Sequence, residues 1–175
     1  MGNKTTEFVG WGEEGPYFED FEIGMVIRSW PGRTFHYYDN FLWSSFSGEC
    51  TPLYIDKEFG KKLGFEKPII NHNIILNYLI AVAVRDTSQN SVAFLGAEYF
   101  KVFKPVYDGD TIYVESEVVF KRESKSRKDS GIITWIHRGY NQNKELIAEI
   151  KRTNLVYKKS YSPWKSYISK LQNEQ

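Results

Sequence analysis

The spacing of apolar residues changes once along the chain, and the change predicts the order of the main elements. Over residues 73–85 apolar side chains recur every three or four positions, as expected of a helix. Nearly every face of that helix is apolar, which predicts that most of its surface is buried. Beyond it the period falls to two, which is typical of strands. We therefore expect one long buried helix followed by a sheet.

The strands and short helices follow from the same pattern. Four strands are expected over 92–103, 111–118, 131–137 and 146–157. A fifth strand is expected near 25–30, closed by the turn pair Pro31-Gly32, and residues 33–35 could continue it. Shorter helices are expected after a cap at Asp39 and over 56–63. Helices segregated to one side of an antiparallel sheet define the α+β class.

Length and composition favour one globular domain. The chain has 175 residues, of which 41% are apolar and 26% charged, enough to bury a real core and too apolar for disorder. We place the domain at 17–160. Residues 1–16 are polar and glycine-rich and are expected to form a flexible arm, and residues 161–175 a tail that could hold a short helix.

The net charge and the number of cysteines limit which binding partners and which cellular compartment are expected. The net charge is +1, which gives no reason to expect nucleic acid or an anionic membrane as a partner. No apolar run reaches the length of a membrane span, and the start of the chain lacks the layout of a signal peptide. The single cysteine, Cys50, excludes an internal disulfide and fits a reducing cytoplasm.

One loop and its surroundings carry a resemblance to a known family. Residues 48–54 read Gly-Glu-Cys-Thr-Pro-Leu-Tyr, and the frame resembles the signature loop of the MaoC-like, or R-specific enoyl-CoA hydratase, family. In that family the loop carries an Asp and a His. This chain has Glu49 at the Asp position and Tyr54 at the His position. The resemblance implies a single hotdog domain, in which a curved antiparallel sheet wraps around one long buried helix.

Further motifs extend the resemblance over roughly residues 17–157. Phe-Lys-Pro-Val at 103–106, followed by Gly-Asp-Thr at 109–111, looks like another family signature, and Asp39-Asn40 looks like part of its first helix. The basic run 122–127, with Gly131, Asn141-Gln142 and Arg152-Thr153, is similar to the subgroup that contains mesaconyl-CoA hydratases. The resemblance therefore implies a homodimer, or a higher homo-oligomer, that hydrates or dehydrates a short, branched or dicarboxylic enoyl-CoA without metal or redox cofactor.

The implied chemistry assigns roles to residues at the loop and at the start of the long helix. Hydration needs an acid–base pair to activate water and amide donors to hold the thioester oxygen. Glu49 is the expected carboxylate and Tyr54 or His72 its partner. The amides around His72 and Asn73 would form the oxyanion hole, and Asn71 and Asn73 are expected to contact the substrate.

The two substitutions in the loop leave other functions open. A phenol with a pKa near ~10 donates well and accepts protons poorly, so Tyr54 is a weak replacement for a histidine base. His72 could supply the missing imidazole and form a new dyad with Glu49, an arrangement that also resembles hotdog thioesterases. A third possibility is a non-catalytic acyl-CoA-binding protein or partner subunit.

Weaker candidates lie outside the loop. Ser91 stands where some family members place a serine near the loop, and Arg122 and Arg127 are candidates to bind the phosphates of CoA. Cys50 lacks a neighbouring base, so no nucleophilic role is expected for it. The three histidines show no metal-ligand spacing, and no metal is expected.

Overall fold

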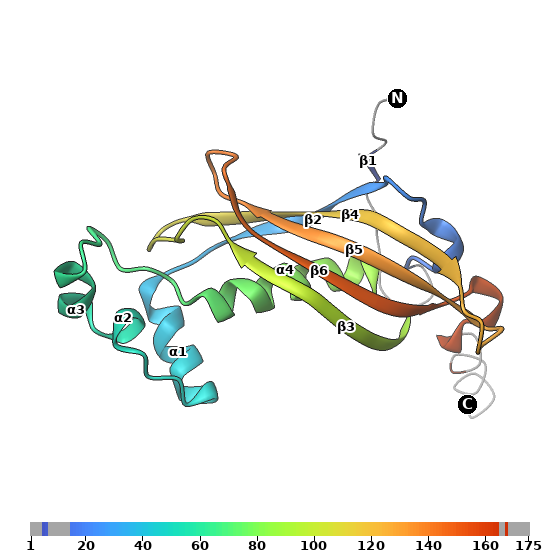
Figure 1. Cartoon of the computed structure of the whole chain (residues 1–175), viewed down its shortest axis with the longest axis horizontal. Helices are drawn as coiled ribbons and strands as arrows, with labels where there is room; N and C mark the ends of the chain where they lie inside the picture. Colours follow the sequence, from blue (N-terminus) through green and yellow to red (C-terminus); the bar gives the residue numbers. More distant parts are fainter. Residues whose placement is uncertain (1–4, 7–14, 165–166, 168–175) are drawn as a thin grey trace, which may run out of the picture.

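One twisted sheet forms the body of the protein in the computed structural model, which describes residues 5–6, 15–164 and 167 (Figure 1). Its strand order is β1-β2-β4-β5-β6-β3. All neighbours pair antiparallel except the short β1, which is parallel to β2. The strands are β1 (Thr5–Thr6), β2 (Val26–Thr34), β3 (Ser91–Val102), β4 (Thr111–Glu123), β5 (Ser130–Tyr140) and β6 (Leu146–Tyr157).

The long helix α4 (His72–Thr87) lies along one face of this sheet. Its residues Ile74, Ile75, Leu79 and Ala83 are buried and form the main core with inward-facing side chains of the strands. The short helices gather at the end of the sheet where α4 begins (Figure 1). They are α1 (Tyr37–Ser47), α2 (Pro52–Ile55) and α3 (Lys57–Lys62). Two single 3₁₀ turns, η2 (Phe18–Asp20) and η3 (Lys159–Tyr161), lie at the opposite end of the sheet.

The structure confirms the α+β class, the long helix and the four later strands. β6 has the predicted bounds, β3 is shifted by one residue, and β4 and β5 run further than their alternation indicated. The extra length of β4 and β5 is explained by their pairing with each other from Tyr113↔Tyr140 to Glu123↔Gly131. Backbone hydrogen bonds across the hairpin carry the strands past the point where the side-chain pattern fades.

Two predicted boundaries were wrong. Pro31-Gly32 does not close the first strand. β2 continues through them, with a shift of register between Ser29 and Arg33. Because the proline lies at this irregularity, its missing amide hydrogen removes one hydrogen bond of the strand pairing and does not end the strand. Helix α1 begins at Tyr37, not after Asp39. Asp39 instead occupies the third helical position, and its Oδ2 accepts from the amide of His36 at 2.9 Å, as in a capping box.

Helix α4 is largely buried, as predicted, and its least buried positions lie on the flank away from the sheet. Leu76 and Ile80 are only partly buried, and Ala81 is exposed. The sheet covers one face of the helix and leaves the opposite flank open. Leu76 and Ile80 nevertheless pack against the main core, so this flank is partly and not fully exposed.

The predicted arm and tail lie largely outside the described residues. Of the arm, Thr5 and Thr6 are described and pair with Val26 and Ile27 of β2. Of the tail, only residues 161–164 and 167 are described, so the predicted short helix over the remainder stays a prediction.

Candidate active site

The loop that follows α1 brings Glu49 to the N-terminus of α4. Helix α1 ends at Gly48, whose φ of 72° is left-handed and whose amide donates to the carbonyl of Ser44. Glycine adopts this conformation without steric cost, so the chain can turn sharply there. The turn places the Glu49 side chain against the first residues of α4.

Four donors hold the Glu49 carboxylate in place. Its Oε2 accepts from Asn71 Nδ2 at 2.9 Å, Asn73 Nδ2 at 3.1 Å and Trp43 Nε1 at 3.1 Å. Its Oε1 accepts from Thr51 Oγ1 at 3.2 Å. The hydrogen bond from Asn71 is the main cause that lowers the pKa of Glu49, although burial acts in the opposite direction. The side chain is therefore an ionised anchor and a poor proton acceptor.

Asn71 and Asn40 tie the loop to the helix. Asn71 caps α4, since its Oδ1 accepts from the amide of Asn73 at 2.8 Å. Its own amide donates to Asn40 Oδ1 at 2.9 Å. Asn40 Nδ2 donates in turn to the carbonyls of Tyr54 at 2.8 Å and Ile69 at 2.9 Å. Asn40, which is fully buried, thus sets the position of both walls of the site.

This role of Asn40 was not predicted from the sequence, although the sequence contains a signal for it. Asn40 lies in the Asp39-Asn40 pair that resembles the family's first helix. A buried asparagine needs partners for both its amide and its carbonyl, and such a residue in an amphipathic helix indicates a structural hydrogen-bond network.

Tyr54 and His72 form the second part of the site. The Tyr54 hydroxyl and His72 Nδ1 are 2.7 Å apart, with Tyr54 in α2 and His72 at the first position of α4. Burial, followed by the charge of Glu49, raises the pKa of Tyr54. The phenol therefore keeps its proton at neutral pH. The imidazole is paired with Tyr54, and the expected Glu49–His72 dyad is not formed, since the hydrogen bonds of Glu49 go to other residues.

An apolar cavity opens beside this pair. Its volume is about 280 Å³, and both Tyr54 and His72 line it. The other lining residues are Phe65, Ile69, Ile70, Ile75, Val102, Lys104, Pro105, Val106 and Ile147. Lys104 stands at its edge, and its Nζ lies 2.5 Å from Glu145 Oε1. A polar pair at the wall of an apolar cavity is the usual arrangement of a small-molecule site.

The backbone at the start of α4 supplies one donor where two were expected. The amide of Asn73 already donates to Asn71 Oδ1. The hydrogen bonds found among the described residues include none from the amide of His72, which lies at the positive end of the helix dipole. His72 therefore presents both an imidazole and an unpaired backbone donor near the cavity.

The structure does not bring the weaker candidates to this site. Ser91 lies beyond the other end of α4, roughly 24 Å away for a helix of this length, where its Oγ accepts from Asn154 Nδ2. Arg122 and Arg127 lie at the far end of β4, roughly 40 Å along the strand from its start beside the site. Arg127 is paired there with Asp129. Cys50 is exposed, and its Sγ lies 3.4 Å from Ser44 Oγ.

The described residues contain neither a cluster of metal ligands nor a membrane-spanning helix. Within residues 5–6, 15–164 and 167, no group of three or more His, Cys, Asp or Glu side chains is placed to hold a metal ion. None of the helices described is long and apolar enough to cross a membrane.

Superposition on solved structures identifies the fold. A Mycobacterium tuberculosis protein described as a double hotdog fold superposes with a TM-score of 0.74 at 22% identity, covering 82% of this chain and 44% of that one. A MaoC domain protein from Chloroflexus aurantiacus superposes with a TM-score of 0.80 at 29% identity, covering 86% of this chain and 42% of the other. The protein has the hotdog fold, with its antiparallel sheet packed against α4.

Sequence comparison gives the family. Residues 4–164 match the family model described as Mesaconyl-CoA hydratase. The β-methylmalyl-CoA dehydratase of Chloroflexus aurantiacus is 32% identical over 146 residues, which are 83% of this chain and 41% of that protein. The chain belongs to the enoyl-CoA hydratase/dehydratase family of MaoC-like proteins. It spans about two-fifths of the length of the curated relatives that it matches.

Proposed function

We propose that this protein catalyses the reversible addition of water to a short enoyl-CoA thioester. The observation that carries the proposal is the Tyr54–His72 pair, which lines the apolar cavity at the N-terminus of α4. The names of the relatives, a mesaconyl-CoA hydratase family and a β-methylmalyl-CoA dehydratase, support the same reaction class.

In the proposed mechanism, the imidazole of His72 is the base. With its Nδ1–H donating to the Tyr54 oxygen, the Nε2 lone pair can accept a proton from water. The water oxygen then bonds to the β-carbon, and the π electrons move toward the thioester oxygen. The backbone amide of His72 would stabilise that charge, and the proton held on Nε2 is returned to the α-carbon. The proton of the Tyr54 phenol can donate a hydrogen bond to the water or the substrate.

Glu49 has a positioning role in this mechanism. Three donors on one carboxylate oxygen and one on the other fix the loop against α4 and oppose protonation. A thioesterase would need Glu49 and His72 to act together on the thioester carbonyl. The hydrogen bonds of Glu49 to Asn71 and Asn73 do not favour that alternative.

The cavity supports a short acyl group that is uncharged at its far end. The lining is apolar apart from the reacting pair and Lys104, whose side chain is about half exposed and pairs with Glu145. A carboxylate placed deep in such a cavity would lose its hydration without a buried cation to replace it. We therefore propose a straight or branched apolar acyl chain as the preferred substrate.

We further propose that the active form is a homodimer. Strand β3 is the last strand of the sheet and leaves one edge unpaired. Phe94 and Leu95 on it are 59% and 50% exposed, and the open flank of α4 adds apolar surface. A second copy would cover both. Light scattering after size exclusion would show twice the 20.5 kDa chain mass, whereas a monomer at micromolar concentration would contradict this arrangement.

The test is an assay with crotonyl-CoA and mesaconyl-CoA that follows enoyl absorbance and free thiol in parallel. Loss of absorbance without thiol release, lost in His72→Gln and kept in Cys50→Ser, is the expected result. Faster turnover of crotonyl-CoA than of mesaconyl-CoA is expected from the apolar cavity. Thiol release would make the protein a thioesterase. No change in either signal, with CoA still bound in calorimetry, would favour a non-catalytic binding protein.

A further inference from the structure

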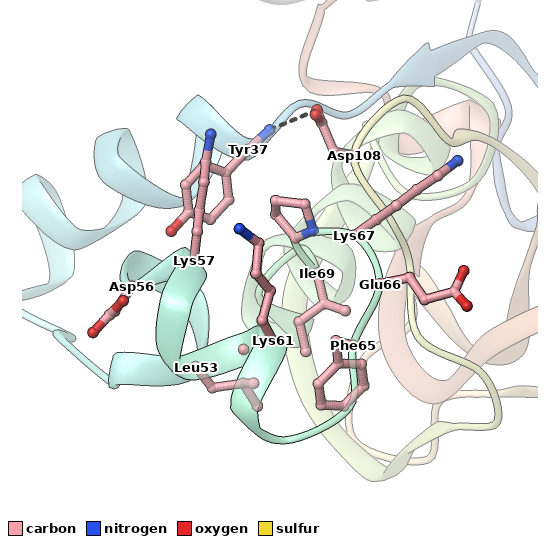
Figure 2. Close-up of a pocket in the computed structure, with 12 residues that line it drawn as sticks. Tyr37, Leu53, Asp56, Lys57, Lys61, Phe65, Glu66, Lys67, Ile69 and Asp108 are labelled. Atoms are coloured by element: carbon pink, nitrogen blue, oxygen red, sulfur yellow. Dashed lines mark hydrogen bonds between the residues drawn. The ribbon is translucent and has the colours of Figure 1, made fainter.

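A second cavity lies directly beside the proposed active site. Its volume is about 160 Å³, and it lies between α3 and the segment that leads into α4 (Figure 2). Phe65 and Ile69 line both this cavity and the acyl cavity. Leu53, the neighbour of Tyr54 in α2, also lines it. The two cavities are therefore adjacent, and one extended ligand could occupy both.

Three lysines surround this second cavity. Lys57 and Lys61 are four residues apart on α3, and Lys67 lies in the following segment. Two like charges at this helical spacing repel each other, so the arrangement costs stability when the cavity is empty. Within the described residues, neither Lys57 nor Lys67 takes part in an ion pair. Lys61 pairs with Glu58 at 2.7 Å, but both side chains are more than 60% exposed, which makes the pair weak.

The carboxylates of the same wall are largely used elsewhere. Asp56 Oδ1 accepts from the amides of Glu58 at 2.9 Å and Phe59 at 3.1 Å, where it caps α3. Asp108 Oδ1 accepts from the amide of Tyr37 at 3.0 Å, the contact dashed in Figure 2. The carboxylate of Glu66 points away from Lys57 and Lys61 (Figure 2). Within the described residues, no carboxylate that lines this cavity forms an ion pair with Lys57 or Lys61, so both ammonium groups remain able to bind an anion.

A buried hydroxyl gives an independent sign of a missing ligand. Tyr37 lines the cavity and is only 7% exposed, yet its hydroxyl has no hydrogen-bond partner in the described structure. Leaving a buried hydroxyl without a hydrogen-bond partner is unfavourable. The ammonium group of Lys57 lies 4.8 Å from the centre of the same ring.

We propose that this cavity binds a phosphate group of the carrier of the thioester substrate, with Lys57 and Lys61 as its cationic partners. The inference rests on the proposed function, because a pantetheine thioester joins an acyl group to phosphate. Ammonium groups bind phosphate strongly through charge-assisted hydrogen bonds. The phosphate site lies on α3, next to the reacting pair, and not on Arg122 and Arg127 at the far end of β4.

The test compares substrates with and without phosphates in a matched set of variants. Lys57→Gln combined with Lys61→Gln removes both cations, and Lys62→Gln removes one cation from the same helix outside the cavity. The substrates are crotonyl-CoA and the N-acetylcysteamine thioester of crotonate, which lacks phosphate. Direct titration with CoA and with 4′-phosphopantetheine measures binding without chemistry.

The double variant should raise the Kd for CoA and the KM for crotonyl-CoA by about tenfold, since two charged contacts are lost. Its kcat/KM for the N-acetylcysteamine thioester should match the parent, and Lys62→Gln should change neither. Weaker binding of 4′-phosphopantetheine in the double variant would assign the cavity to the pantetheine phosphate. An equal effect of Lys62→Gln, or no effect of the double variant, would overturn the proposal. Because titration needs no turnover, an inactive protein that still binds CoA would contradict the proposed function alone.

Discussion

The two ends of α4 hold polar clusters of opposite charge. At the N-terminal end, the Glu49 carboxylate accepts from Asn71 and Asn73. At the C-terminal end, Arg152 Nη2 donates to Thr87 Oγ1 at 3.0 Å and to Ser88 Oγ at 2.9 Å. The positive end of a helix dipole favours an anion and the negative end a cation, so both clusters suit their places.

The two clusters differ in their access to solvent, and this difference distinguishes a structural role from a functional one. Arg152 is 3% exposed, and its Nε donates to His137 Nε2 at 2.6 Å. His137 is completely buried, and its Nδ1 lies 2.6 Å from Ser116 Oγ. Burial lowers the pKa of Arg152 to about 10. The imidazole of His72, in contrast, is exposed and lines a cavity. The buried cluster around Arg152 stabilises the fold, and the exposed cluster at the N-terminus of α4 is accessible to a substrate.

The largest effect is expected for His72→Gln. Loss of the general base should lower kcat for crotonyl-CoA by about 10²–10³-fold, or about 3–4 kcal/mol in the barrier. Because His72 is exposed, the midpoint of thermal unfolding should stay close to that of the parent. A variant that keeps more than a third of the activity would show that His72 is not the base.

The next largest effect is on stability, for Arg152→Ala. The change leaves His137, Thr87 and Ser88 without their shared donor and opens a cavity, so the free energy of unfolding should fall by about 3 kcal/mol. Urea titration measures it. Arg138→Ala on β5 is the control, since Arg138 pairs with Glu117 and Glu149 near the surface and should cost about 1 kcal/mol. Equal losses in the two variants would contradict the special role of the buried cluster.

The closed cluster should also make stability depend on pH. Burial, followed by the charge of Arg152, holds the pKa of His137 well below 6.5. Below pH 6.5 the unfolded chain therefore binds a proton that the folded chain does not. Stability should fall with decreasing pH by up to about 1.4 kcal/mol per pH unit. Urea titrations at pH 7, 6 and 5 measure the slope, and His137→Gln should flatten it; an unchanged slope in that variant would exclude His137 as its source.

The smallest effect is expected for Glu49→Gln. As a positioning residue, Glu49 can be replaced by an amide that keeps one acceptor, so kcat/KM should fall only about tenfold. The lowered pKa of Glu49 gives stability that is present above pH 4.5 and lost as the pH falls below it, and this component should be absent in the variant. A loss of activity as large as that of His72→Gln would assign Glu49 to the proton transfer itself.

The candidate site could be located from the sequence but not assembled from it. The loop motif identified Glu49 and Tyr54, and the helix start identified His72. The pairing was not predictable, because Glu49 and Asn71 are 22 positions apart and Tyr54 and His72 are 18 apart. Only the path of the chain from α1 to α4, held by the hydrogen bonds of Asn40 to the backbone of Tyr54, Ile69 and Asn71, determines which of these side chains face each other. The distances of Ser91, Arg122 and Arg127 from the site could not be inferred, because local sequence patterns contain no information on them.

The sequence alone determined the class of the fold and its main elements. The change from a helical period to an alternating one is a local property, and it predicts α4 and the strands because burial follows side-chain spacing. The tertiary structure decided what the polar residues do. It placed one anion and one cation at opposite ends of α4, closed one cluster under the sheet and left the other beside two cavities. Hydrogen bonding between distant residues depends on positions in space, which spacing along the chain does not specify.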